Sequence, residues 1–88
     1  MAESAPALTV FGADWCSDCR RSKRLLDRLA VPYLYRDLEE EPAAAAEAEA
    51  ISGRRSIPVV VLPDGRFLVE PPDSLLQGEL VGAGLLPS

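Results

Sequence analysis

Short apolar runs alternate with longer amphipathic segments along the chain, and most of them end at a glycine or a proline. Residues 7–11 (ALTVF) are apolar and partly β-branched and precede Gly12, which predicts a first strand. Residues 17–30 carry leucines on one side of a helix and Arg or Lys on the other, and Pro32 limits that helix. Residues 32–38 (PYLYRDL) predict a second strand, and the helical connection makes it parallel to the first.

The second half of the chain predicts a helix, a hairpin and a last helix. Residues 42–53 (PAAAAEAEAISG) fit an alanine-rich, lightly packed helix with proline in its first turn and glycine at its C-terminal cap. Residues 56–70 (SIPVVVLPDGRFLVE) contain two apolar runs joined by Pro-Asp-Gly, a hairpin signal. We expect Asp73 and Ser74 to cap the last helix, with Gln77 completing a capping box.

The predicted element order is β-α-β-α-β-β-α, an α/β arrangement without an internal repeat or a linker. A chain of 88 residues fits one domain with a single core. We expect residues 7–88 to form that domain, after a flexible N-terminus at residues 1–6.

Composition and charge exclude several classes of function. Nine basic against fourteen acidic residues give a net charge of −5, which argues against general binding to nucleic acid or to an anionic membrane. The first residues carry no secretory pattern and no stretch reaches membrane-spanning length, so we expect a cytoplasmic protein. The chain has no histidine, which excludes a Cys–His nucleophile pair and imidazole metal ligands.

The chain has two cysteines, Cys16 and Cys19, in the stretch WCSDC. Such a pair is typical of a redox dithiol, of half a metal site or of a structural disulfide. A structural zinc site needs four ligands, so a metal would require a site, or an iron–sulfur cluster, shared between two subunits. A bridge across two residues restricts the unfolded chain little, and reducing compartments rarely keep structural disulfides. The sequence favours a redox dithiol.

The predicted helix begins beside Cys16, where free backbone N–H groups and the helix dipole stabilise an anion. We therefore expect Cys16 to be the more acidic thiol and the nucleophile, and Cys19, one turn further on, to be the resolving thiol. Asp18 opposes a thiolate at Cys16, whereas Arg20 and Arg21 favour it. The sequence does not rank these opposing effects.

Four stretches together resemble a glutaredoxin-like member of the thioredoxin-fold superfamily: WCSDC, SIPVVV at the place of the family's cis-proline strand, PDG in the hairpin, and the helix from about Asp73. The resemblance covers residues 7–86 and implies a four-stranded mixed sheet flanked by three helices. It also implies a thiol–disulfide oxidoreductase. The detailed pattern is most similar to the mycoredoxins of actinobacteria, which reduce mixed disulfides with mycothiol, a sugar-based thiol.

The resemblance implies a substrate site around the dithiol. A cis bond before Pro58 would turn the Ile57 backbone toward Cys16, where its N–H and C=O groups meet an incoming chain or thiol. Trp15 lies in the loop before the nucleophile and is predicted to be a substrate platform.

Charged residues give further candidates. Arg54 and Arg55 are either solvated loop charges or partners of a substrate carboxylate. Asp73 is a second candidate beyond its capping role, because a carboxylate at this place holds the substrate's amine in glutathione-binding relatives. The basic residues of the first helix are interpreted as a solvated face or as a docking site for an acidic partner or an anionic thiol: Arg20, Arg21, Lys23, Arg24 and Arg28. Tyr33 and Tyr35 are interpreted as packing.

Three departures from glutathione-using relatives argue against glutathione specificity, and Asp18 is unfavourable for any low-molecular-weight thiol. Those relatives commonly have a tyrosine between the cysteines, a lysine shortly before the first, and a Gly-Gly-Asp stretch before the last helix. This chain has Ser17 and Asp18 between the cysteines, Asp14 before Trp15, and EPPDS in place of the glycines.

The predicted mechanism is attack of a Cys16 thiolate on a mixed or protein disulfide, followed by release of product through Cys19 or a small thiol. It needs no bound metal or organic cofactor, only a low-molecular-weight thiol as co-substrate, and we expect a monomer. Two alternatives remain open: an electron-donor redoxin recharged by a thioredoxin-reductase-type flavoprotein, and a scaffold that binds an iron–sulfur cluster.

Overall fold

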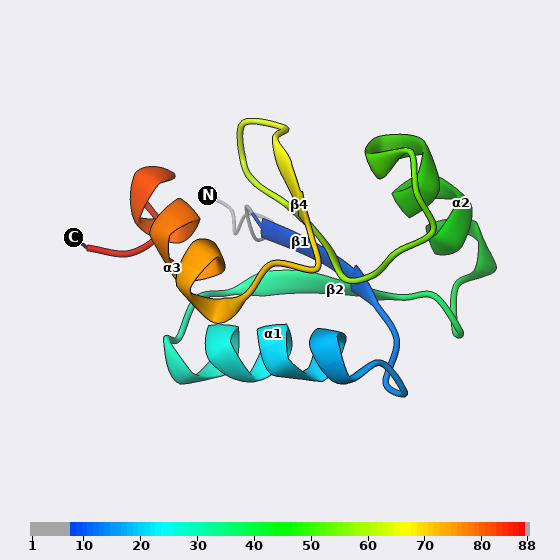
Figure 1. The fold of residues 1–88 in the computed structure, drawn as a ribbon, viewed down its shortest axis with the longest axis horizontal. Coiled ribbons are helices and arrows are strands. Elements are labelled where there is room, and N and C mark those ends of the chain that lie inside the picture. The colour runs from blue at the N-terminus through cyan, green and yellow to red at the C-terminus, as the bar shows by residue number, and fades with distance from the viewer. Residues whose placement is uncertain (1–7, 88) are drawn as a thin grey trace, which may run out of the picture.

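The computed structural model describes residues 8–87 and has the element order that the sequence predicts (Figure 1). The expected flexible N-terminus at residues 1–6, and residue 7 of the first predicted strand, lie outside the described residues. The elements are β1 (Leu8–Gly12), α1 (Ser17–Arg28), β2 (Tyr33–Asp37), α2 (Pro42–Ser52), β3 (Val59–Val61), β4 (Phe67–Val69) and α3 (Asp73–Gly82).

The strands form one mixed sheet in the order β2-β1-β3-β4. β1 pairs with β2 in parallel, as the helical crossover requires, and pairs with β3 in the antiparallel sense. β3 and β4 form the predicted antiparallel hairpin. The predicted α/β fold, a four-stranded mixed sheet with three helices, is confirmed.

The helices cover both faces of the sheet (Figure 1). Side chains alternate between the two faces along a strand, so Leu8 and Val10 of β1 pack against α1 and α3, whereas Phe11 packs against α2. The contact with α2 is slight, because that helix buries only Ala44 and Ala48. Within residues 8–87 no helix has the length and apolar character needed to cross a lipid bilayer.

α1 ends two residues before the predicted position. The helix stops at Arg28, and Ala30 takes a left-handed backbone conformation with φ 58°. The amide of Val31 donates to the Leu26 carbonyl and the amide of Ala30 to the Asp27 carbonyl, which is the hydrogen-bond pattern of a Schellman cap. Glycine usually occupies that position, so an alanine gives no sequence signal for it.

The predicted caps of α3 are wrong. The N-cap residue is Pro72, and no side-chain hydrogen bond caps the helix. Asp73 is the first helical residue, where a carboxylate interacts favourably with the helix dipole without capping the helix. The predicted capping box of Ser74 and Gln77 is therefore absent. The N-cap at Pro72, in an extended conformation that proline favours, lies two residues before the Ser74 hydroxyl.

Gly12 lies where α1 packs closely against the sheet. It follows Leu8 and Val10 on the same face of β1, and a Cβ added there would lie 2.9 Å from the Cys19 Sγ and 2.9 Å from the Tyr35 Oη. Contacts under 3.0 Å require the neighbours to move. The absence of a side chain at this position therefore lets the second cysteine pack directly against the strand.

We expect Gly12→Ala to lower the free energy of unfolding by about 1–3 kcal/mol, because the added methyl group overpacks a site with no space. Urea unfolding of the reduced protein measures the change. Gly78→Ala is the control: a Cβ at Gly78 of α3 meets nothing within 4 Å, so that change should stabilise by up to about 1 kcal/mol through helix propensity. Equal stability of Gly12→Ala and wild type would contradict the tight approach.

Candidate active site

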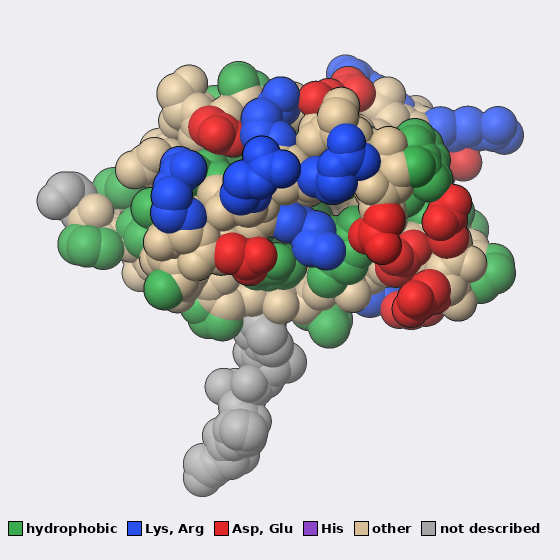
Figure 2. Space-filling model, turned by 90° about the horizontal axis from the view of Figure 1, so that it is seen from below, with side chains coloured by type: hydrophobic (Ala, Val, Ile, Leu, Met, Phe, Trp, Pro, Cys, Tyr) green, Lys and Arg blue, Asp and Glu red, His purple; other side chains and the backbone are tan. Residues whose placement is uncertain are grey.

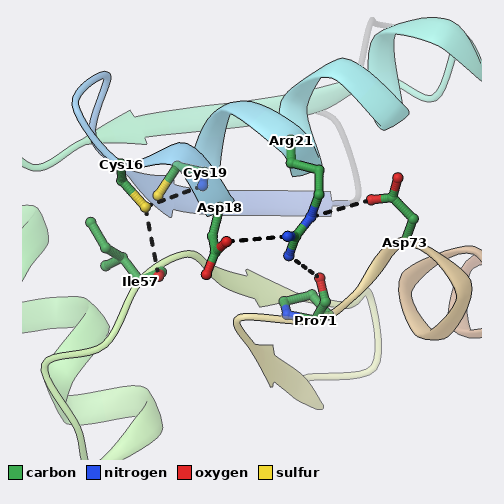
Figure 3. A network of polar contacts seen from close by, with 7 residues as sticks. All are labelled: Cys16, Asp18, Cys19, Arg21, Ile57, Pro71 and Asp73. Carbon is green, nitrogen blue, oxygen red and sulfur yellow. Dashed lines mark hydrogen bonds and ion pairs between the residues drawn. The ribbon is translucent and has the colours of Figure 1, made fainter.

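Cys16 is the N-cap residue of α1. Its Sγ accepts a hydrogen bond from the Cys19 backbone N–H at 3.1 Å and lies 3.8 Å from the Ile57 carbonyl oxygen, to which the thiol donates (Figure 3). Only 9% of Cys16 is exposed. An N–H donor at this distance and the positive end of the helix stabilise negative charge on the sulfur.

Cys19 lies deeper than Cys16 and has no exposed surface. Both cysteines are free thiols. The pKa of Cys19 is raised from 9.0 to about 12, mainly by burial and also by the hydrogen bond with Cys16 and the negative charges of Cys16 and Asp18, against one lowering contact from the Ala13 backbone. Cys19 is therefore a protonated, enclosed thiol at neutral pH.

Tyr35 lies beside the buried thiol, a neighbour that the sequence interpretation as packing did not anticipate. Its Oη is buried and has no hydrogen-bond partner among the described residues, and the Lys23 ammonium lies 4.0 Å from the ring centroid. Burial raises the pKa of Tyr35, and the negative charges of Cys19 and three further groups add to it. Alternation along β2 could have placed Tyr35 on the α1 face, but the neighbour of its hydroxyl depends on the tertiary fold.

The peptide bond between Ile57 and Pro58 is cis, and the loop that contains it faces the N-terminus of α1. Between them lies a groove of about 410 Å³. Trp15 forms one wall and is 66% exposed. The residues that line the groove are Trp15, Cys16, Ser17, Asp18, Arg55, Ser56, Ile57 and Glu70.

The groove contains two residues that the sequence reasoning did not name as site residues, Ser56 and Glu70. Glu70 is the charged one. This residue has a left-handed backbone conformation with φ 51°, and its amide donates to the Pro58 carbonyl at 2.9 Å. The replacement of the family's glycines by Glu-Pro-Pro was the available signal, because glycine is the residue that takes such a conformation without strain. Two carboxylates, Asp18 and Glu70, and one guanidinium, that of Arg55, therefore border the groove.

The remaining predicted site residues lie around the groove. Arg54 borders a neighbouring hollow of about 430 Å³ against α2. Arg55 borders both, and its Nε lies 3.7 Å from the Glu49 carboxylate. Arg20 donates to the Asp14 carbonyl oxygen at 2.6 Å across the loop before Cys16.

Asp73 does not line the groove. Its Oδ1 is buried and lies 3.7 Å from the Nε of Arg21, which also forms an ion pair with Asp18 at 3.2 Å (Figure 3). The guanidinium thus lies between two carboxylates that the sequence gives no reason to connect.

The basic residues of α1 gather on one side of the molecule, visible as the blue side chains over this helix in Figure 2. Arg20, Arg24 and Arg28 are exposed. The acidic side chains gather mainly toward one end of the same view. This distribution fits the expected solvated helix face, and it extends from the end of the helix that carries the cysteines.

These features define a class of protein. A cysteine at a helix N-terminus, a second buried thiol one turn later and a cis-proline loop opposite are the site of a thioredoxin-fold thiol–disulfide oxidoreductase. The glutaredoxin family profile matches residues 8–68, and the chain belongs to the glutaredoxin family.

Relatives and solved structures agree with this assignment. Two Mycobacterium tuberculosis proteins that carry the name glutaredoxin, from different strains, are each 33% identical over 76 residues, which is 85% of this chain and 90% of theirs. The buckwheat glutaredoxin in complex with glutathione has a TM-score of 0.71 and 27% identity over 91% of this chain and 81% of that one. The glutaredoxin-like NrdH-redoxin of Escherichia coli has a TM-score of 0.64 and 25% identity over 80% and 91%.

The raised pKa values predict a loss of stability at alkaline pH. Burial raises the pKa of Cys19 to about 12, and burial and the bond to Asp27 raise that of Tyr33 from 10.0 to about 12. The unfolded chain then loses these protons first, so it binds fewer protons than the native state and stability falls as pH rises from about 9 to about 12.

We expect the reduced protein to lose on the order of 1 kcal/mol of unfolding free energy between pH 8 and pH 10.5. Urea unfolding in the presence of a reductant measures it. Tyr33→Phe removes one of the titrating groups and should show a shallower fall. A free energy that stays constant or rises over this interval contradicts the burial argument.

Proposed function

We propose that the protein reduces mixed disulfides of a low-molecular-weight thiol, and protein disulfides, through Cys16 and Cys19. A thiolate at Cys16 attacks the substrate disulfide, forming a new sulfur–sulfur bond and releasing the first thiol. A second molecule of the small thiol can then attack the bound half of the substrate, which returns Cys16 to the thiolate and releases that half as a disulfide with the attacking thiol. Alternatively, Cys19 attacks the Cys16 sulfur and the bound half leaves as a thiol. When Cys19 attacks, the two cysteines become a disulfide, and the small thiol then reduces it.

The observation that carries the proposal is the difference between the two sulfurs. Cys16 borders the groove and faces both a backbone N–H and the Ile57 carbonyl, whereas Cys19 is enclosed against Gly12. A disulfide that enters the groove therefore reaches Cys16 first. Because the groove is formed within one chain, the reaction needs no second subunit, and a reducing compartment such as the cytoplasm would keep both thiols available.

Charge around the groove supports mycothiol rather than glutathione as the co-substrate. Glutathione carries two carboxylates and one amine, and the groove presents two carboxylates against a single guanidinium. The Asp73 carboxylate, whose counterpart holds the amine in glutathione-binding relatives, already faces Arg21. Mycothiol is a sugar-based thiol that would bind through hydroxyl groups. Neither feature therefore weakens its binding as much as that of glutathione.

The alternative function, an electron-donor redoxin recharged by a flavoprotein reductase, is supported by one comparison. The NrdH-redoxin that this chain resembles is described as having a thioredoxin-like activity profile. The iron–sulfur scaffold would need ligands from a second subunit, because among residues 8–87 no three or more potential ligands gather at one point.

The deciding experiment compares reduction of a mycothiol mixed disulfide with that of its glutathione counterpart. We expect wild type to turn over the mycothiol substrate at least tenfold faster in kcat/KM, and Cys16→Ser to be inactive on both. Full activity of Cys16→Ser would refute the mechanism. If Cys19→Ser retains activity, the small thiol resolves the intermediate; if it does not, Cys19 does.

The same assay separates the alternative. A thioredoxin reductase with NADPH is supplied in place of the small thiol, and oxidation of NADPH is followed in the presence of an insulin disulfide. Turnover there, together with slow turnover of both small mixed disulfides, identifies an electron-donor redoxin. A colourless, metal-free monomer in solution excludes the cluster scaffold.

A further inference from the structure

Asp18 is the residue that most clearly opposes the proposed chemistry. It stands between the two cysteines in the first turn of α1 and borders the same groove as Cys16. Its charge reaches the dithiol: burial is the main cause of the raised pKa of Cys19, and the Asp18 carboxylate adds to it. An uncompensated carboxylate here disfavours a second negative charge on Cys16.

The Asp18 carboxylate is turned toward Arg21 (Figure 3). The Arg21 Nη1 lies 3.2 Å from the Asp18 Oδ1, in the i, i+3 relation that places two helical side chains on one face. Both side chains are about two-fifths exposed, so an unsupported pair of this kind would be weak and mobile.

Two further contacts fix the guanidinium. Its Nη2 donates to the Pro71 carbonyl at 3.3 Å, and its Nε lies 3.7 Å from the Asp73 Oδ1. The Arg21 Nε and the Asp73 Oδ1 are both buried. Contacts from α1, from the segment before α3 and from α3 itself thus hold one planar group, which reduces the entropy lost on pairing with Asp18.

We propose that Arg21 is a positioning residue for the nucleophile, because it holds the Asp18 carboxylate in an ion pair and so cancels the charge that opposes a Cys16 thiolate. This inference rests on the proposed role of Cys16. Arg20, the neighbouring cation, does not take this part, since its guanidinium is bound to the Asp14 carbonyl oxygen. The opposite charges of Asp18 and Arg21 therefore have little net electrostatic effect on the Cys16 sulfur.

The experiment measures the rate at which iodoacetamide alkylates Cys16 as a function of pH. A Cys19→Ser parent leaves one thiol in the full chain, so the rate reports the Cys16 thiolate alone. Arg21→Gln should react about three- to tenfold more slowly at pH 7, because the carboxylate is left uncompensated. Asp18→Asn should react faster than the parent, and the double variant should return to within about twofold of it, since both charges are then gone.

Three variants separate charge compensation from a structural effect. Arg24→Gln removes a cation one turn further along the same helix and should stay within about twofold of the parent. Arg21→Lys keeps the charge and should react at least about twice as fast as Arg21→Gln. Asp73→Asn in the Arg21→Gln background should not restore the rate, although it also removes an unpaired carboxylate.

Two results overturn the proposal: an Arg21→Gln rate equal to that of the parent, or a double variant as slow as Arg21→Gln alone. Restoration by Asp73→Asn would likewise assign the effect to α3 and not to Asp18. Thermal unfolding of each variant confirms that the alkylation rates belong to folded protein. The proposed function fails on a different result, namely that disulfide turnover does not depend on Cys16. That result leaves the order of the alkylation rates unchanged.

Discussion

The close packing of α1 against β1 at Gly12 is the contact on which the rest of the site depends. A strand residue without a side chain lets the Cys19 sulfur lie directly on the sheet. This contact sets the distance between α1 and the sheet, and it places Cys16, the N-cap residue of α1, opposite the Ile57 carbonyl. Neither sulfur could occupy its present position if the helix were displaced outward by one methyl group.

This arrangement makes two chemically identical side chains unequal. Cys19 loses all contact with solvent and lies beside the Cys16 sulfur, so its charged form is penalised. Cys16 keeps one edge on the groove and gains a backbone N–H donor. Thiol–disulfide exchange uses such a difference, because one sulfur attacks the substrate disulfide and the other attacks the intermediate that results.

Membership of the glutaredoxin family establishes the reaction class, whereas the surroundings of the dithiol decide its partners. The groove differs from the glutathione pattern at Asp18 and Glu70, which bring two negative charges to its border. Arg21 pairs with Asp18 and also contacts Asp73 and the Pro71 carbonyl, and Pro71 lies in the stretch that replaces the family's glycines (Figure 3). The departures from the family pattern are therefore linked in space, although they lie in separate stretches of the sequence.

The sequence by itself determined the element order, the hairpin, the end of α2 at Gly53 and the placement of the dithiol at a helix start. Periodicity and turn chemistry act over a few neighbouring residues, so these features can be predicted locally. Two local features gave no side-chain signal: the left-handed Ala30 and the N-cap of α3 at Pro72. The tertiary structure decided the neighbours of Tyr35 and Arg21, because these depend on contacts between segments that are distant in the sequence.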